Sequence, residues 1–168
     1  MSSESEAYYK SELGIIKVTA EDDAITSLYF QDEAPGVPAP ENAILKECLR
    51  QLDEYFCGKR QSFTLKLKPA GTEFQKRVWD ELLKIPFGET ISYLELANRL
   101  GDKKLIRAVG GANGRNKISV IIPCHRVIGN NGELIGYGGG LWRKEWLLNH
   151  EGSFLSFRLF QDVRLPRP

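Results

Sequence analysis

Three chemically active side chains stand side by side in this sequence, at Cys124, His125 and Arg126. They follow two isoleucines and a proline, a run typical of the end of a buried strand. A cysteine attacks as its thiolate, which a nearby base or positive charge favours. Neighbouring strand residues point to opposite faces, so direct contact between His125 and the sulfur is not assured, and a water could bridge them. Glu151 could orient the imidazole. From the residues alone, a reactive thiol and a buried structural cysteine both stay open.

The cysteines and histidines of the chain do not complete a metal site or a disulfide framework. There are three cysteines, Cys48, Cys57 and Cys124, and two histidines, His125 and His150. An odd number of cysteines at wide spacing argues against structural disulfides, and no C-x-x-C pair marks a zinc site. We therefore expect no bound metal.

Composition and charge are typical of a packed soluble protein with one basic region. Hydrophobic residues make up 42% and charged residues 27% of the 168 residues, as in globular domains. No apolar run approaches the ~20 residues that span a bilayer, and no signal-peptide pattern is present, so we expect a cytoplasmic protein without a membrane partner. Residues 70–127 hold ten Lys/Arg against six Asp/Glu. Such a region can attract a polyanion, although a solvated helical face would have the same composition.

The first part of the chain, residues 1–68, predicts a small α/β domain. Residues 8–19 and 24–31 alternate loosely and are rich in β-branched and aromatic side chains, which predicts a hairpin. Apolar residues at helical spacing predict an amphipathic helix over 41–56, and the alternating FTLKLK at 63–68 predicts a further strand.

From residue 69 the pattern becomes mainly helical. Thr72 and Gln75 fit a capping box that starts a helix. A second capping box opens a short helix over 92–100, Gly101 closes that helix, and a third helix follows directly. Two short helices around a tight turn predict a helix-turn-helix.

The last clear helix covers residues 141–150, which extends a C-terminal domain over 69–152. The tail at 153–168 has mixed apolar and basic character and is not assigned a structure. We therefore expect an α+β fold, in which a small N-terminal α/β domain of hairpin, sheet and helix precedes a mainly helical C-terminal domain with a helix-turn-helix.

The second helix of the predicted pair carries small residues almost everywhere except at Arg107. Gly110 and Gly111 stand in its interior, next to Ala112, although glycine costs ~1 kcal/mol there relative to alanine. Close packing on another helix would explain these residues, and so would close approach to a bulky partner such as a nucleic-acid backbone. Arg107 is then either a solvated surface residue or a side chain that projects into a groove.

Several separated segments together resemble the O6-alkylguanine-DNA alkyltransferases. The segments are PCHRV, RAVGGAN, NKISVII, GYGGG, EWLLNHEG, GTEFQKRVW, IPFGETISY and LANRLG. The resemblance covers roughly residues 72–152, and residues 1–68 fit in outline as the variable N-terminal α/β domain of that family. Chance agreement across so many segments is remote.

This resemblance implies binding of duplex DNA through the minor groove, with the target nucleotide flipped out of the stack, because a stacked base hides its reactive atom. Arg107 matches the arginine that takes the place of the extruded base, and Tyr93 matches the tyrosine that helps to rotate the nucleotide. Gly110, Gly111 and Ala112 match the small residues that allow the tight fit. Weaker matches to positions that touch the DNA backbone fall on Gln75, Leu94, Asp102 and Asn130.

The resemblance also implies that Cys124 takes the alkyl group from guanine O6 in one in-line displacement. His125 matches the base that acts on the thiol through a water, Glu151 the carboxylate that orients it, and Asn116 an asparagine that ties the active-site turn together. Tyr93 would protonate the departing oxygen. Val127, Tyr137 and Gly138 match the walls of the guanine pocket. The thioether is stable, so each molecule is expected to act once, as a monomer and without a cofactor.

Three other functions are weighed against this interpretation. An alkyltransferase-like protein that binds lesions without chemistry would replace the reactive cysteine, typically with tryptophan, whereas Cys124 is present. A helix-turn-helix regulator explains Arg107 and the basic region but not PCHRV together with Glu151. A cysteine hydrolase explains the thiol but not the small-residue helix.

Overall fold

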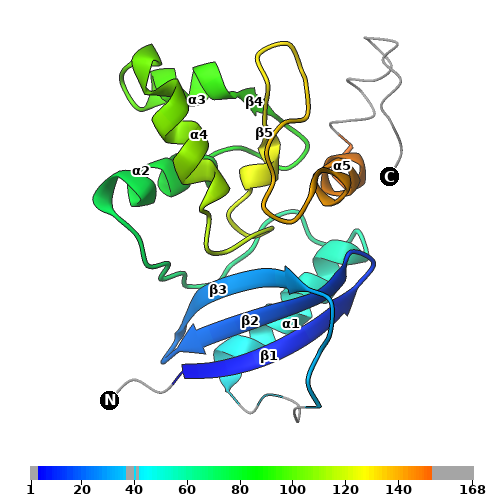
Figure 1. Ribbon diagram of the computed structural model, residues 1–168. Helices are drawn as coiled ribbons and strands as arrows, with labels where there is room; N and C mark the ends of the chain where they lie inside the picture. The colour runs from blue at the N-terminus through cyan, green and yellow to red at the C-terminus, as the bar shows by residue number, and fades with distance from the viewer. Residues whose placement is uncertain (1–3, 37–39, 41, 153–168) are drawn as a thin grey trace. The chain divides into compact units, whose positions relative to one another are not determined.

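The structure, a computed structural model, describes residues 4–36, 40 and 42–152, so the tail at 153–168 lies outside the described residues. The chain divides into two compact units (Figure 1). Of the described residues, one unit comprises those up to Ala70 together with Lys117–Ile121, and the other comprises Gly71–Asn116 and 122–152. The fold is α+β as predicted, with a sheet and a helix in the first unit and mainly helices in the second. None of the described helices is long and apolar enough to cross a membrane.

Three antiparallel strands form the sheet of the first unit, in the order β1-β2-β3 (Figure 1). They are β1 (Glu4–Ser11), β2 (Gly14–Glu21) and β3 (Ala24–Gln31). The predicted hairpin of 8–19 and 24–31 is therefore wrong in its first strand, because a turn divides that strand. The Ser11 hydroxyl accepts a hydrogen bond from the Leu13 backbone N–H at 3.0 Å, and Gly14 has a φ of 107°, which favours glycine.

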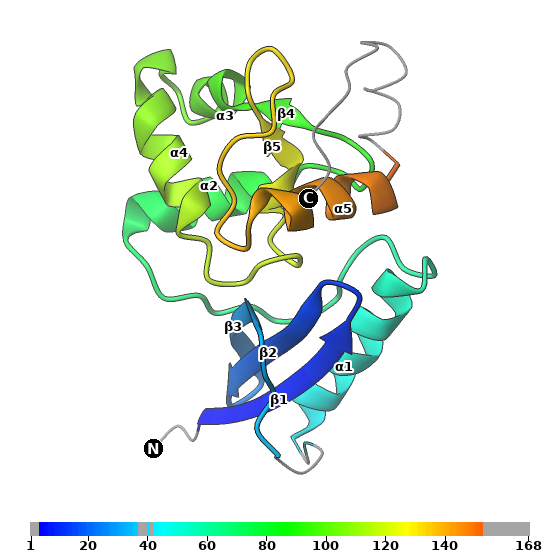
Figure 2. The same ribbon diagram turned by 45° about the vertical axis from the view of Figure 1, so that its right-hand side comes forward.

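Helix α1 (Ala43–Phe56) confirms the predicted helix over 41–56 to within two residues. The Asn42 side chain accepts hydrogen bonds from the first backbone N–H groups and so caps the helix. Its apolar face, which includes Leu45 and Leu52, is fully buried. The helix contacts all three strands and lies alongside the sheet in both views (Figures 1 and 2).

Two segments from elsewhere in the chain cover the outer edge of β3. Ile25 pairs with Leu67 and Leu28 pairs with Ile118, each through a single parallel bridge. The strand predicted at 63–68 is thus reduced to one bridge. The second segment, Lys117–Ile121, was placed by sequence in the helical domain, yet it belongs to the first unit. Covering the edge satisfies backbone groups that would otherwise be open to another chain.

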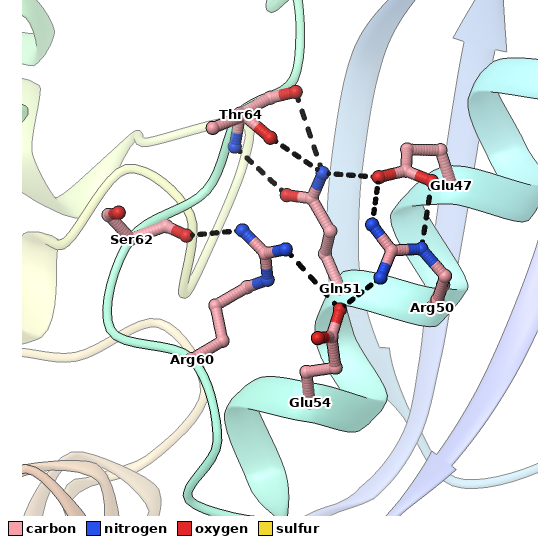
Figure 3. A network of polar contacts seen from close by, with 7 residues as sticks. All are labelled: Glu47, Arg50, Gln51, Glu54, Arg60, Ser62 and Thr64. Carbon is pink, nitrogen blue, oxygen red and sulfur yellow. Dashed lines mark hydrogen bonds and ion pairs between the residues drawn. The ribbon is translucent and has the colours of Figure 1, made fainter.

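A polar network fixes the chain between α1 and the segment that leads to Leu67 (Figure 3). The fully buried amide of Gln51 donates to the Thr64 hydroxyl at 2.9 Å and to Glu47 at 2.8 Å, and it accepts from the Thr64 backbone N–H at 2.9 Å. Buried polar groups stabilise a fold when they are satisfied in this way. The contacts hold residues 60–64 against the helix without making them a strand.

The described part of the second unit contains four α-helices, two single-turn 3-10 helices and one short pair of strands. They are α2 (Glu73–Leu82), β4 (Ile91–Ser92), α3 (Tyr93–Arg99), the 3-10 helix η1 (Lys103–Leu105), α4 (Ile106–Gly114), the 3-10 helix η2 (Cys124–Arg126), β5 (Val127–Ile128) and α5 (Leu141–His150). The predicted helix-turn-helix corresponds to α3 and α4, which contact each other. The predicted capping box of Thr72 and Gln75 is confirmed, with backbone-to-side-chain hydrogen bonds of 3.0 and 3.1 Å.

Trp79 fixes α2 against α4 in the core of this unit. Its indole N–H donates to the Ala112 carbonyl at 2.9 Å, and its side chain is 1% exposed. Gly71 lies under the ring, where an added Cβ would stand 2.5 Å from an indole carbon. On the buried side of α4, the small side chain of Ala112 therefore allows α2 to pack closely against this helix.

The segment before Cys124 is not the buried strand that the sequence predicts. Val120 has a φ of 70°, an unusual value for a β-branched residue, and this conformation interrupts an extended chain. Cys124 begins the 3-10 helix η2, and only Val127 and Ile128 then form a strand, parallel to β4. The helix η2 contacts α2 and α5 and lies between them in both views (Figures 1 and 2).

Candidate active site

Cys124 lies at the start of η2 with its side chain almost enclosed, at 6% exposure. Two asparagines hold the backbone around it. The Asn116 amide donates to the Ile122 carbonyl at 2.7 Å, and the Asn113 amide donates to the Cys124 carbonyl at 3.3 Å. Both asparagines are buried; Asn113 lies in the last turn of α4, and Asn116 lies two residues beyond the end of this helix. The backbone around the thiol is therefore held by the helix that carries Arg107 and by the residues that directly follow it.

His125 and Glu151 form a buried pair behind the thiol. The distance from His125 Nε2 to Glu151 Oε2 is 2.8 Å, and both side chains are completely shielded from solvent. Glu151 follows the last residue of α5, which places its carboxylate against η2. The other ring nitrogen, Nδ1, is buried and has no hydrogen-bond partner among the described residues. With the proton on Nε2, Nδ1 is the basic nitrogen.

Arg126 also binds the Glu151 carboxylate. Its Nε donates to Glu151 Oε1 at 2.7 Å and its Nη2 donates to Oε2 at 3.0 Å, a bidentate contact. Its Nη1 donates to the Ile85 carbonyl at 2.6 Å. The carboxylate of Glu151 is therefore held by two neighbouring residues of η2, which fixes the plane of the imidazole.

The environment sets the protonation of these groups. Burial lowers the pKa of His125, and the charge of Glu151 opposes this effect without reversing it. Burial alone would raise the pKa of Glu151, but His125 and Arg126 together hold it well below its usual range. Burial also raises the pKa of the Cys124 thiol, while the Asn116 amide and the positive charge of Lys144 lower it. At neutral pH the site thus holds a carboxylate and a neutral imidazole beside a thiol that needs a base.

A cavity of about 360 Å³ lies beside α4 in the same unit. Its lining residues are Tyr93, Ile106, Arg107, Gly110, Gly129, Asn130 and Ile135. The hydroxyl of Tyr93 donates to the Ile135 carbonyl at 3.0 Å. Burial raises the pKa of that hydroxyl, and the nearby Cys124 adds to the effect, so the phenol keeps its proton. A cavity of this volume fits a small organic group.

The exposed side of α4 presents Arg107 and Gly111. Gly111 follows four positions later on the same side of the helix and is exposed, with no atom within 4 Å of the position that a Cβ would take. Gly110 is half-buried beside the Tyr93 ring. Ala112 differs from the expectation, because it is 4% exposed and faces the core. Its side chain therefore does not reach the surface that Arg107 and Gly111 share.

The four residues that match DNA-backbone contacts more weakly make local hydrogen bonds in the structure. Gln75 closes the capping box of α2, and the Asp102 carboxylate accepts from the Lys104 backbone N–H at 2.8 Å, which caps η1. The Asn130 side chain accepts from the Leu94 backbone N–H at 3.3 Å, so the structure brings these two together.

The three predicted pocket residues follow η2 in the chain. Val127 is fully buried in β5. Tyr137 is half-buried and its carbonyl accepts from the Gly140 backbone N–H at 2.9 Å. An added Cβ at Gly138 would meet only the Gly114 carbonyl, at 3.9 Å, so this position has room for a larger residue.

Sequence reasoning assigned no role to Arg126, Asn113 or Lys144. A signal was present for Lys144, which stands three and four positions before Leu147 and Leu148 and so belongs to the buried stripe of α5. A charged residue in such a stripe is unusual. Arg126 and Glu151 are 25 positions apart, and no local pattern predicts their contact.

Comparisons with known proteins agree with this geometry. Residues 73–153 match the profile of the 6-O-methylguanine DNA methyltransferase DNA-binding domain, and residues 5–69 match the ribonuclease-like domain of the same proteins. A methylated-DNA–protein-cysteine methyltransferase of Methanosarcina acetivorans is 45% identical over 152 residues, which cover 88% of this chain and 97% of the relative. One from Mycobacterium leprae is 56% identical over 112 residues, covering 67% and 68%.

A solved structure of Mycobacterium tuberculosis OGT in complex with DNA is 42% identical, with a TM-score of 0.78, and the match covers 87% of this chain and 92% of that one. The O6-methylguanine methyltransferase of the same organism gives 41% identity and a TM-score of 0.77, covering 89% and 94%. The family profiles, the sequence relatives and the solved structures all indicate the same family. This chain belongs to the 6-O-methylguanine DNA methyltransferase family.

Proposed function

We propose that this protein repairs DNA by moving the alkyl group of O6-alkylguanine onto Cys124 in a single, irreversible step. The observation that carries the proposal is the buried set of Cys124, His125 and Glu151 in the unit that also holds Arg107 and Tyr93. The names of the relatives support it, because they describe methyl transfer from DNA to a protein cysteine.

The chemistry consumes only the thiol and the alkylated base, while His125 and Tyr93 move protons. Nδ1 of His125 takes the thiol proton through a bridging water, while Nε2–H stays hydrogen-bonded to Glu151. The sulfur then attacks the alkyl carbon in line with the C–O6 bond. The new S–C bond forms as the C–O bond breaks, and the electron pair passes to O6. The hydroxyl of Tyr93 turns from the Ile135 carbonyl to the departing base and gives it a proton. Tyr93 regains a proton through solvent as the imidazolium of His125 releases the one it took from the thiol, so the products are guanine and a thioether.

The arrangement around the nucleophile suits a flipped-out base. Asn116 keeps the turn before Cys124 closed, and Val127, Tyr137 and Gly138 would form the walls around the guanine. Flipping costs a few kcal/mol of lost stacking, which contacts between the protein and the vacated position must offset. We assign that contact to Arg107, because it is exposed at the rim of the cavity.

DNA would bind along the exposed side of α4 through its minor groove. Gly110 and Gly111 leave space for close approach of a sugar-phosphate backbone. Gln75, Leu94, Asp102 and Asn130 are the proposed backbone contacts, through main-chain groups where the side chains already act as caps. All these residues fall within 69–152, which we propose as the DNA-binding and alkyl-transfer domain.

The thioether has no leaving group that water displaces readily, so the protein acts once and then stays modified. A reactive thiol that must remain free also suits a reducing compartment. Together with a DNA substrate, this favours the cytoplasm as the location.

The proposal is tested with a duplex oligonucleotide that carries one O6-methylguanine. Wild-type protein should restore guanine, whereas Cys124→Ser should bind the duplex and leave the lesion unchanged. Cys48→Ser is the matched control, because Cys48 is a buried cysteine of the first unit and its loss should not affect repair. Repair by Cys124→Ser at the wild-type rate would exclude the proposed chemistry, and wild-type protein that binds the lesion without removing it would be a recognition protein only.

A further inference from the structure

Two of the three tryptophans of the chain lie on the side of α5 that faces solvent. Trp142 and Trp146 are four positions apart, so they share one side of the helix, opposite its buried residues. Trp142 is 41% exposed, the neighbouring Leu141 is 48% exposed, and Trp146 is half-buried. The solvent side of an amphipathic helix is normally polar, and clustered apolar side chains on a surface mark contact sites. This side of α5 is therefore an interaction surface.

The aromatic rings on this side of α5 are held in place. The guanidinium of Arg143 lies over the ring of Trp142, 4.6 Å from its centroid, and a Cβ added at Gly140 would stand 3.3 Å from a carbon of the same ring. One turn further along, the rings of Trp146 and His150 stack at 4.9 Å with an interplanar angle of 16°. Trp142, Trp146 and His150 form an aromatic row with a rise of about 6 Å per step.

The chain leaves α5 close to the last member of this row. Gly152 has a φ of 84°, and its backbone N–H donates to the Asn149 carbonyl at 3.0 Å, a turn that ends a helix and redirects the chain. Residues 153–168 follow directly. The profile of the family's DNA-binding domain ends at residue 153, so the family does not account for this C-terminal segment.

The sequence of the C-terminal segment has the period of an extended chain with one apolar side. Leu155, Phe157 and Leu159 alternate with Ser156 and Arg158. In an extended chain, every second side chain points to the same side, at intervals of about 6.6 Å. These intervals are close to the steps of about 6 Å along the aromatic row. An apolar side of the segment can therefore follow the row from one ring to the next.

We propose that residues 153–160 dock in extended form along the aromatic row of α5, with their alternating apolar side chains turned toward the rings. The order of the contacts follows from where the segment starts, so Leu155 lies near His150 and Leu159 near Trp142. Burial of apolar surface from both sides supplies the driving force. The surface lies outside the set of residues proposed for alkyl transfer, so the inference goes beyond the proposed function.

The first test is acrylamide quenching of tryptophan fluorescence in the full chain. Phe157→Asp should release the segment, because burial of an unpaired carboxylate is costly. We expect the quenching constant to rise at least about twofold, since Trp142 and Trp146 become open to the quencher while Trp79, at 1% exposure, stays shielded. Ser156→Asp is the matched control, because it adds the same charge on the other side of the extended segment, and its quenching constant should equal that of wild type. An unchanged constant in Phe157→Asp, or an equal rise in both variants, would overturn the inference.

Tryptic cleavage tests the same contact from the side of α5. Arg158 lies within the stretch proposed to dock, and Arg164 lies beyond it. Relative to a synthetic peptide of residues 153–168, the wild-type chain should be cut after Arg158 at least about tenfold more slowly than after Arg164, because a docked stretch must open before a protease can cut it.

Trp142→Ser removes one end of the row and should bring this ratio to within about threefold of that of the peptide. Leu83→Ser is the control, because Leu83 is 46% exposed in the same unit but lies outside α5, and it should keep the wild-type ratio. A wild-type ratio equal to that of the peptide, or a protected Arg158 in Trp142→Ser, would contradict docking on the row.

A second copy of the chain is the competing occupant of the aromatic row. Sedimentation velocity and quenching at several protein concentrations distinguish the two, because docking within one chain does not depend on concentration. We expect a monomer with the same quenching constant throughout, whereas a dimer whose dissociation opens the tryptophans would overturn the inference. None of these measurements involves DNA, so their failure and a failure of repair at Cys124 are separate outcomes.

Discussion

His125 and Glu151 meet at 2.8 Å with both side chains fully shielded from solvent, and the carboxylate of Glu151 simultaneously accepts two hydrogen bonds from Arg126. One carboxylate thus serves two purposes. It balances the buried charge of the arginine, and it leaves Nδ1 of the imidazole as the basic nitrogen. The stability of the second unit and the chemistry of Cys124 depend on the same group, and both dependences can be measured.

Glu151→Gln should lower the free energy of unfolding by about 3–5 kcal/mol, because it leaves the guanidinium of Arg126 buried without a counter-ion. The measurement is urea unfolding at neutral pH. Glu145→Gln is the matched control, since Glu145 lies on the same helix but is partly exposed, and its change should stay within about 0.5 kcal/mol. Equal effects of the two substitutions would contradict the structural role of Glu151.

Acid should destabilise the protein in two stages. The folded-state pKa of His125 lies below its usual 6.5, and that of Glu151 lies below its usual 4.5. The unfolded chain therefore binds more protons than the folded chain in acid, so the stability present above 6.5 falls as the pH drops through that value and falls again below 4.5. Unfolding free energies measured across this range test the direction. A protein that becomes more stable as the pH falls from neutrality toward 5 would refute it.

Arg107→Ala should impair repair of duplex DNA much more than reaction with free O6-benzylguanine. We expect a loss of at least about tenfold in duplex repair, because Arg107 is proposed to fill the place of the flipped base, and the free base needs no flipping. Arg50→Ala controls for the loss of one exposed positive charge, since Arg50 lies on α1 in the first unit. If Arg107→Ala lost the same factor of activity in both reactions, the proposed role of Arg107 in base flipping would be contradicted.

Gly111→Leu should separate stability from DNA binding. An added Cβ meets no atom within 4 Å at this position, and leucine is a better helix former than glycine by about 0.8 kcal/mol. The free energy of unfolding should therefore stay the same or rise. The affinity for duplex DNA should fall at least about tenfold, because the side chain would stand where a groove must approach α4. Reaction with free O6-benzylguanine should be unchanged. Undiminished DNA affinity would exclude this side of α4 as the interface.

Binding of duplex DNA should weaken as salt concentration rises, since lysine and arginine contacts to phosphates release counter-ions. Titrations at several salt concentrations give the slope directly. The basic region of residues 70–127, which carries ten Lys/Arg, predicts a clearly negative slope. An affinity that does not depend on salt would argue against phosphate contacts by this region.

Local signals in the sequence predicted the elements that carry the site. The capping box of Thr72 and Gln75 joins residues only three apart, so a local sequence pattern is enough to predict it, and the structure contains it. The helix of residues 141–150 is confirmed at both ends, and with it the position of Glu151. The identity of the nucleophile and its partners came from the resemblance, because spacing alone favoured a buried structural cysteine over a reactive one.

The remaining features depend on contacts between distant residues or on single backbone angles. The alternation before Cys124 resembles a strand, but the positive φ of Val120 interrupts it. The apolar pattern at residues 8–19 gives no sign of the turn that divides this segment, because Leu13 in the turn is itself apolar and buried. No periodic pattern of apolar residues predicts that segment 117–121 joins the sheet of the first unit. Nor does such a pattern predict the hydrogen bond from Lys144 to the Ile135 carbonyl.

Alkyl transfer to Cys124 is measured by the mass of the peptide that bears this residue after reaction with an excess of O6-methylguanine duplex. This peptide should become heavier by one methyl group, the peptides of Cys48 and Cys57 should stay unchanged, and one lesion should disappear for each protein molecule. A methyl group on another cysteine, or many lesions repaired by each chain, would contradict this transfer.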